Sequence, residues 1–204
     1  MRHHGETMKQ LKKRHAVILF LLPAVLIVVV DLWTKDAVFK YLDVEEKMVS
    51  SKESPRPRPV VFYQDRKVII EDFFWFEANY NYGAFSGWFS DRTGILATFS
   101  VVAALAMVGL FAYSLRYGPE RAFSLALGLL LGGAVGNFYD RAVLNGVRDW
   151  IRWFVVVDGK QHVWPNFNIA DSAICIGVGM LIIRELIRWR HEVQEKQLAE
   201  QEAG

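Results

Sequence analysis

The sequence predicts an all-α membrane protein with four transmembrane helices, a small external cap that contains β-strands, and a surface helix. Three observations predict this fold class. Hydrophobic residues make up 52% of the 204 positions, and they concentrate in four runs near the roughly 20 residues that a membrane helix needs. These runs lack a polar face, which argues against a soluble bundle of four buried helices. Lys and Arg residues cluster beside the runs, as at the cytoplasmic ends of membrane helices.

The apolar runs divide the chain into a membrane domain and two charged ends. The runs are about 16–33, 95–115, 122–139 and 169–187. We expect a basic N-terminus over 1–15, a membrane domain over 16–188 and a charged tail over 189–204. The first run is not followed by a small-x-small cleavage site, so we interpret it as an uncleaved anchor.

The basic residues also predict the orientation. They lie in the N-terminal segment, in the short connection near Arg116 and Arg121, and in the C-terminal tail. A chain with four spans places all three segments on one side, and an excess of Lys and Arg marks the cytoplasmic side. We therefore expect both termini in the cytoplasm and a multi-pass protein whose cap, at about 36–93, lies outside.

Three stretches define the expected cap. Hydrophobic residues recur at helical spacing over 36–50, which predicts a helix along the membrane surface. The stretch "VVFYQDRKVII" predicts a small hairpin that turns at Gln64–Arg66. The aromatic stretch at 72–89 is typical of a membrane interface.

Polar residues collect at the outer ends of the apolar runs. Asp31 and Lys35 are four residues apart and share a helix face, where an exposed ion pair is one interpretation. In the third run, Gly128, Gly132 and Gly136 recur every four residues, which predicts a close approach to a neighbouring helix.

A stripe beside these glycines carries Asn137, Asp140 and Arg141, and the fourth run opens with Asn168 and Asp171. A carboxylate is favoured at a helix N-terminus by about 0.3–1 kcal/mol, which offers a structural explanation for Asp171. However, several polar residues lie at the same expected level of the membrane, and so many of them together favour a functional site.

Paired carboxylates have a particular chemistry. Two like charges at close range share a proton, so that one carboxylate accepts a proton from water while the other acid polarises a carbonyl group. Such a pair can hydrolyse a peptide bond without a metal, a thiol or an activated serine. The chemistry alone does not decide which two of Asp140, Asp149 and Asp171 meet.

Other classes of chemistry have little support in the sequence. The five histidines are scattered and the chain has one cysteine, Cys175, so we expect no metal site, no cofactor and no disulfide. We interpret Cys175 as a small packing residue. The net charge of +2 favours no nucleic-acid partner.

Five motifs together resemble bacterial lipoprotein signal peptidase (signal peptidase II), a family of aspartic peptidases. They are, in the family's order, "DLWTK", "NYGAFSG", "GGAVGNFYDR", "VRDWI" and "FNIADSA". The second motif has one small residue, Ala84, where the family usually has two. The segment at 43–72 is also long for the family, which implies an enlarged cap.

The resemblance implies a membrane endopeptidase of the bacterial inner membrane. It would remove signal peptides from diacylglyceryl-modified prolipoproteins by cutting before the lipidated cysteine, at the external face and as a monomer embedded in membrane lipid. The family's catalytic acids map onto Asp149 and Asp171. The resemblance assigns substrate-binding or supporting roles to Asp31, Lys35, Asn81, Gly83, Asn137, Asp140, Arg141, Asn168 and Ala170.

Other functions are compatible with parts of the pattern. Ser86 and Lys35 offer the residue types of a serine–lysine signal peptidase, although no basic residue stands at a fixed offset from Ser86. The Gly-x-Gly-Asp string of presenilin-like and prepilin peptidases does not occur. A membrane transporter would use the acids as a relay, but it usually has repeated halves and polar groups near mid-membrane. A catalytically inactive homologue would keep the same polar cluster.

Overall fold

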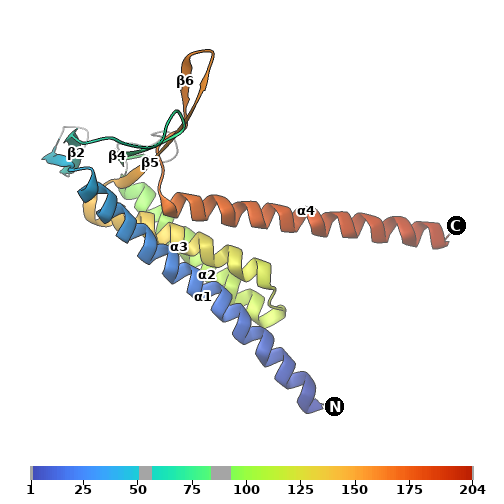
Figure 1. Ribbon diagram of the computed structural model, residues 1–204. Helices are drawn as coiled ribbons and strands as arrows, with labels where there is room; N and C mark the ends of the chain where they lie inside the picture. Colours follow the sequence, from blue (N-terminus) through green and yellow to red (C-terminus); the bar gives the residue numbers. More distant parts are fainter. Residues whose placement is uncertain (1, 51–56, 84–92, 204) are drawn as a thin grey trace.

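The computed structural model describes residues 2–50, 57–83 and 93–203. Within these ranges the elements are, in chain order, α1 (Arg2–Tyr41), β1 (Glu45–Val49), β2 (Arg58–Tyr63), β3 (Lys67–Ile70), β4 (Phe74–Asn81), α2 (Thr93–Tyr117), α3 (Arg121–Leu144), β5 (Val147–Val157), β6 (Lys160–Val163) and α4 (Ile169–Ala203). The strands gather at one end of the helices, and both chain termini lie at the other end (Figure 1). The molecule is therefore a helical base with a β-structured cap.

The four predicted apolar runs all form helices, but they differ in their suitability as membrane spans. Among the described residues, three helical segments are long and apolar enough to cross a membrane: Gln10–Tyr41, Ile95–Tyr117 and Arg121–Leu144. The α4 helix is not one of them, because only residues 172–183 separate the charges of Asp171 and Arg184. The outer surface of the base carries many exposed large apolar side chains, such as Leu22 and Leu105.

Glycines allow α3 to pack closely against its neighbours, as their spacing predicts. A methyl group at Gly132 would come within 2.8 Å of the Ala24 carbonyl oxygen of α1. At Gly136 it would come within 2.7 Å of the Asp31 carboxylate, and at Gly133 it would collide with the backbone of α4. The glycine face therefore brings the polar residues of α1, α3 and α4 within reach of each other.

The predicted surface helix over 36–50, an extension of the first helix, is wrong beyond Tyr41. The first helix continues to Tyr41, and Asp43 then adopts a left-handed conformation with φ 46°. Aspartate tolerates this conformation, and the Val44 amide donates to the Phe39 carbonyl as the helix ends. The chain then forms β1, which pairs antiparallel with β2. The cap therefore begins with a strand and not with a helix on the membrane surface.

The predicted hairpin at Gln64–Arg66 is also wrong, although both strands exist. The first strand, β2, pairs with β1, and the second, β3, pairs with β4. The Gln64 side chain takes the place of a strand partner, since its amide donates to the Ala78 carbonyl at 2.8 Å and accepts from the Ala78 amide at 2.5 Å. The stretch is thus a crossing between two sheets.

The larger sheet has the strand order β3-β4-β5-β6. Its longest strand, β5, was not expected from the sequence, which identified residues 140–168 only as an external connection. The strand pairs with β4 so that Asp149 lies opposite Asn79 and Val147 lies opposite Asn81. Beyond the sheet, β5 and β6 continue as a hairpin that projects away from the helices (Figure 1). The outer end of α1 packs on the sheet through an apolar cluster centred on Leu42 and Trp150.

Candidate active site

The predicted polar residues meet where the helical base joins the sheet. Asp31 and Lys35 come from α1, and α3, β5 and the start of α4 supply the others. Six of them are buried: Asp31, Lys35, Asn137, Asp140, Asp149 and Asn168. We call these six residues with Asp171 the polar cluster. The sequence prediction that these side chains share one site is consistent with this arrangement, although the chemistry of each is a separate question.

A buried ammonium group connects two acids of the polar cluster. Lys35 Nζ lies 2.6 Å from Asp31 Oδ2 and 3.2 Å from Asp140 Oδ2, and all three side chains are fully buried. It also donates to Asn137 Oδ1 at 3.2 Å. The exposed ion pair that the spacing of Asp31 and Lys35 suggested is therefore replaced by a buried network. Removing one partner of such a network leaves an uncompensated charge, at a cost of about 3–5 kcal/mol.

Two amides connect the acids that the resemblance identifies as catalytic. Asn168 Nδ2 donates to Asp149 Oδ1 at 2.7 Å and to Asn137 Oδ1 at 3.1 Å. Asn137 Nδ2 in turn donates to Asp171 Oδ1 at 2.8 Å. A continuous hydrogen-bonded path therefore runs from one carboxyl group to the other through two neutral amides, which fixes the position of both.

The first turn of α4 is held by side chains of the polar cluster. Asn168 caps the helix because its side-chain Oδ1 accepts from the backbone amide of Asp171 at 2.9 Å. In return, the backbone amide of Asn168 donates to Asp171 Oδ2 at 3.2 Å. Asp31 Oδ1 accepts from the Ala170 amide at 2.9 Å. Ala170 is fully buried beside Gly136, so a larger side chain would not fit. These contacts place Asp171 at the helix start.

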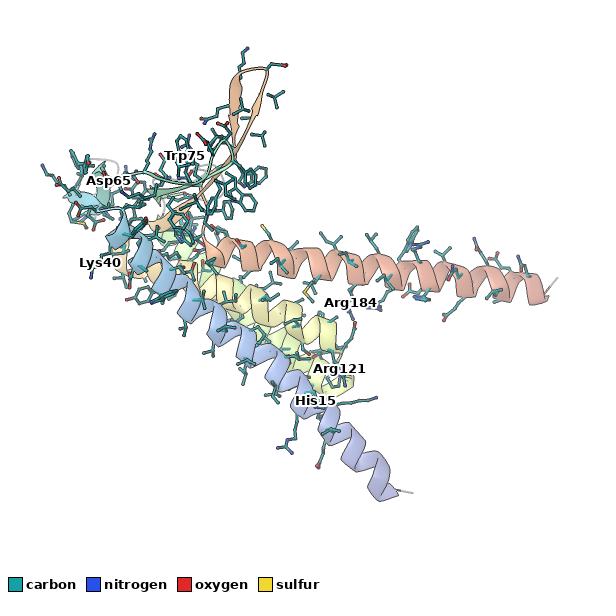
Figure 2. All side chains as sticks on the ribbon, in the orientation of Figure 1. His15, Lys40, Asp65, Trp75, Arg121 and Arg184 are labelled. Atoms are coloured by element: carbon teal, nitrogen blue, oxygen red, sulfur yellow. The ribbon has the colours of Figure 1, made fainter. Side chains whose placement is uncertain are left out.

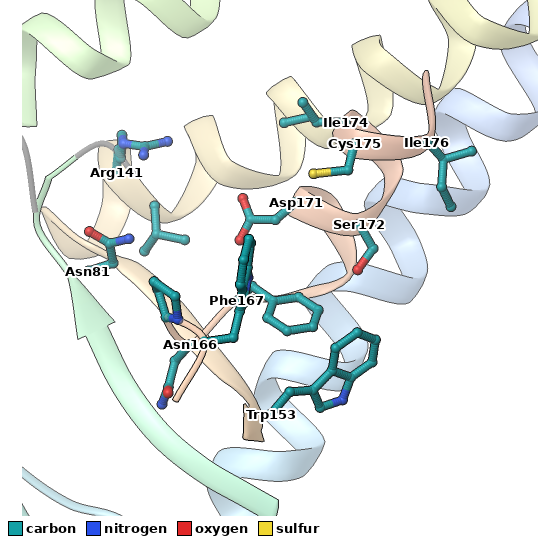
Figure 3. Close-up of a pocket in the computed structure, with 13 residues that line it drawn as sticks. Asn81, Arg141, Trp153, Asn166, Phe167, Asp171, Ser172, Ile174, Cys175 and Ile176 are labelled. Carbon is teal, nitrogen blue, oxygen red and sulfur yellow. The ribbon is translucent and has the colours of Figure 1, made fainter. Parts of the chain in front are cut away.

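The two acids differ in their access to solvent. Asp149 is 1% exposed, whereas Asp171 lines a cavity of about 680 Å³ beside the first turns of α4. Figure 3 shows Asp171 on the first turn of α4 among the residues that line this cavity. Most of the remaining lining is apolar and comes from β5, the segment after β6, and α4: Val147, Trp153, Trp164, Pro165, Phe167, Ile174, Cys175 and Ile176.

The electrostatics favour a shared proton on the acids. Burial raises the pKa of Asp149 well above its ordinary value, and the neighbouring Asp171 charge raises it further. Hydrogen bonds from Asn81 and Asn168 and the charge of Lys35 oppose this shift. Since burial and like charge dominate, Asp149 holds a proton at a pH where an exposed carboxyl group has lost it.

Arg141 and Asn81 line the cavity on the side of β4, and Gly83 contacts both of them. Arg141 donates to the carbonyl groups of Gly83 and Asn137 at 3.3 and 3.4 Å, and Asn81 Oδ1 accepts from the Gly83 amide at 3.0 Å. The Arg141 Nε has no partner among the described residues. Ala84 and Ser86, named above, lie outside the described residues.

Several residues of the site were missed by sequence reasoning. Arg148 binds Asp140, and Asp36 binds Arg148 in turn. Arg148 stands inside the motif "VRDWI", so its position beside an acid was the available signal. The aromatic residues Trp153 and Trp164 line the cavity only because β5 and β6 pair, which no local pattern indicated.

The interpretation of Cys175 needs correction. It is exposed and lines the cavity instead of packing inside the helical base. Asp171 lies on the same face of α4 as Cys175, one helical turn away. Within the described part of the chain, no group of three or more His, Cys, Asp or Glu residues is arranged to hold a metal ion.

Comparisons with known proteins give a consistent result. The family model for signal peptidase (SPase) II matches residues 23–187. A lipoprotein signal peptidase of Anoxybacillus flavithermus is 30% identical over 90% of this chain and 93% of its own length. Another, of Francisella tularensis subsp. novicida, is 36% identical over 80% of this chain and 88% of its own. A bacterial membrane enzyme solved by the in meso method matches with a TM-score of 0.61 and 27% identity, covering 81% of this chain and 85% of that one.

Proposed function

The chain belongs to the signal peptidase II family, and from this premise we propose that Asp149 and Asp171 are the acids with which it cleaves prolipoproteins. The observation that carries this proposal is the path Asp149–Asn168–Asn137–Asp171, which joins the two acids beside an apolar cavity. Peptide hydrolysis by paired carboxyl groups needs this combination of proximity, a shared proton and access for substrate.

The proposed reaction uses one proton on the pair. The ionised carboxylate accepts a proton from a water molecule, whose oxygen attacks the scissile carbonyl carbon. The protonated carboxyl group donates its proton to the carbonyl oxygen, which gives a tetrahedral intermediate. Its C–N bond breaks as the leaving amine takes the proton that the first carboxylate accepted from water, and the second carboxylate recovers its proton from the hydroxyl group of the intermediate. Asp171, which lines the cavity, meets substrate first, and Asp149 acts from behind it. Asn137 and Asn168 keep both carboxyl groups in place during these transfers.

The proposed substrate is a prolipoprotein that carries a diacylglyceryl group on the cysteine after the scissile bond. The apolar cavity lies next to Asp171 and extends along the first turns of α4. A lipid-anchored cysteine would hold the scissile bond at this level, while the acyl chains contact apolar side chains and lipid. Arg141 and Asn81 would bind the peptide or head-group oxygens at the rim.

The membrane topology that this function needs has α4 as a fourth span. Arg184 Nε donates to Glu120 Oε2 at 2.7 Å, so α4 reaches the start of α3 before it continues alone. His15, Arg121 and Arg184 all lie away from the cap, whereas Lys40 and Asp65 lie close to it (Figure 2). We propose cytoplasmic termini and an external active site in the inner membrane, with the chain acting as a monomer. Reporter fusions at Asp158 and at the C-terminus on the same side would contradict this topology.

The decisive test is cleavage of a defined substrate. Purified enzyme should release the signal peptide from diacylglyceryl-modified prolipoprotein, and mass spectrometry should place the new N-terminus at the lipidated cysteine. The same precursor without the diacylglyceryl group should remain uncut. Absence of cleavage by folded protein would favour an inactive homologue, and solute uptake into vesicles without cleavage would favour a transporter.

A further inference from the structure

Arg148 connects the polar cluster to the surface of the cap. The residue is 8% exposed, and its guanidinium donates to Asp140 Oδ1 at 2.9 Å and to Asp140 Oδ2 at 3.3 Å. A third bond goes to Asp36 on α1, whose side chain is 73% exposed. The two-point contact with Asp140 is the planar geometry in which arginine and carboxylate bind most strongly.

The charge of Asp140 is therefore shared between two cations. On one side lies Arg148, and on the other Lys35 Nζ at 3.2 Å, which also pairs with Asp31 at 2.6 Å. Without Arg148, the Lys35 ammonium would have to compensate both Asp31 and Asp140. Its charge also acts on Asp149, because the positive charge of Lys35 favours ionisation of that acid.

We propose that Arg148 is a positioning residue for the reaction: it neutralises Asp140, and this leaves the positive charge of Lys35 to act on the pair Asp149 and Asp171. This inference rests on the proposed function, because it concerns the protonation of the same two acids. Arg148 acts through its neighbours, since it is not among the residues that line the cavity.

The backbone of Arg148 supports the same role. Its amide donates to Asp140 Oδ2 at 3.0 Å, and its carbonyl accepts from Asn168 Nδ2 at 3.2 Å. That Asn168 nitrogen also binds Asp149, the next residue along the strand. Burial disfavours the charged guanidinium, but the hydrogen bonds and charge of Asp140 raise the pKa of Arg148 above its ordinary value. The arginine is therefore permanently charged.

The charged groups near the two acids come from α1, α3 and β5. They are Asp31 and Lys35 of α1, Asp140 and Arg141 of α3, and Arg148 of β5. Loss of the Arg148 charge makes this environment one unit more negative. A more negative environment holds the shared proton more strongly, so the protonated form persists to higher pH.

The test is the pH dependence of kcat for purified Arg148→Gln, Arg148→Lys and unmodified enzyme on diacylglyceryl-modified prolipoprotein. In Arg148→Gln, both the acidic and the basic limit of activity should move to higher pH, by about half a pH unit to one unit. Arg148→Lys keeps the charge, so its limits should return to the unmodified positions even if kcat remains lower. Lys40→Gln removes the same charge from an exposed side chain of α1, and as the matched control it should leave both limits in place.

Two outcomes would overturn the inference. If the limits of Arg148→Gln stay in place while its melting temperature falls, Arg148 only supports the fold. If Lys40→Gln moves the limits as far as Arg148→Gln, the shift reports the general charge of the protein surface and not the contact of Arg148 with Asp140. Infrared titration of the protonated carboxyl band, identified by its loss in Asp149→Asn, gives the same shift without turnover. If Arg148→Gln shifts this band but Asp149→Asn retains full activity, the proposed catalytic role of Asp149 is contradicted. The electrostatic effect of Arg148 on that carboxyl group then still stands.

Discussion

The two halves of β5 differ in burial although they form one continuous strand. Residues 147–151 are all buried, and they include Asp149 and Arg148, which the helices hold. Residues 152–157 are mostly exposed, and their outer end is paired only with β6. The first half contacts α1, α3 and β4, whereas the last residues of the second half, 155–157, pair with β6 alone. The difference supports the proposal that the buried half carries the catalytic Asp149, while Trp153 of the outer half lines the cavity.

The largest expected effect compares the same substitution at both ends of this region. Asp149→Asn, like Asp171→Asn, removes a titrating carboxyl group and keeps its shape, so kcat should fall by at least about a hundredfold. Asp158→Asn changes the turn after β5, where Asp158 has φ 52° that asparagine also tolerates. Its kcat should match that of the unmodified enzyme in the prolipoprotein assay. An equal loss in both variants would remove the distinction between the two halves.

Asp140→Asn should act mainly through stability. Asp140 binds Lys35 and Arg148 with no exposure, so its loss leaves two buried cations undercompensated and should cost about 3–5 kcal/mol. Thermal melts in detergent should show a much lower midpoint than for Asp65→Asn, whose carboxylate is exposed. A folded Asp140→Asn without turnover, beside an Asp149→Asn with normal turnover, would instead make Asp140 and Asp171 the catalytic pair.

The cavity wall offers a third test through the single cysteine. A bulky maleimide on Cys175 should block most turnover, because Cys175 shares the cavity with Asp171. Cys175→Ala should retain turnover close to the unmodified value and should be insensitive to the reagent. Loss of turnover in folded Cys175→Ala before any treatment would instead indicate a thiol mechanism.

The smallest expected effects compare one substitution at the two ends of β5. Val147 is 2% exposed, so Val147→Thr buries a hydroxyl group and should destabilise the fold by about 1–3 kcal/mol. Val157 is 52% exposed, and Val157→Thr should change stability by no more than about 0.5 kcal/mol. Melting curves of the two variants measure this difference. Equal destabilisation would show that the hairpin is as tightly packed as the buried half.

The sequence predicted the helices and the polar cluster better than it predicted the cap. Long apolar runs and the glycines at 128, 132 and 136 carry strong local signals, and the polar residues on those helices come together once the helices pack. Strand pairing depends on partners distant in the chain. For example, the side chain of Gln64 bonds to the backbone of Ala78 where a neighbouring strand would otherwise pair. An alternation of apolar and polar residues in the sequence does not reveal such a contact. The surface helix failed because one left-handed residue, Asp43, ends α1.

The partners of the acids could not be predicted for a similar reason. Arg148 was visible in its motif, but its contacts depend on the fold, which brings Asp140 of α3 and Asp36 of α1 next to β5. Likewise, the exposure of Cys175 depends on a cavity that exists only where β5, the segment after β6, and α4 meet. Residue type and spacing predicted three candidate acids and the family motifs selected two of them, whereas the cations that compensate them are a property of the assembled site.

The most direct test of the central claim is the pH dependence of kcat for the unmodified enzyme. Because burial and the charge of Asp171 raise the pKa of Asp149, the pair should keep one proton above the usual range of a carboxyl group. Activity should be bell-shaped: it falls at low pH, where both acids are protonated and no base remains, and at high pH, where both are ionised and no acid remains. Asp149→Asn should lose activity over the whole pH range. A kcat that stays constant as pH rises through neutrality and beyond would contradict a proton-sharing pair.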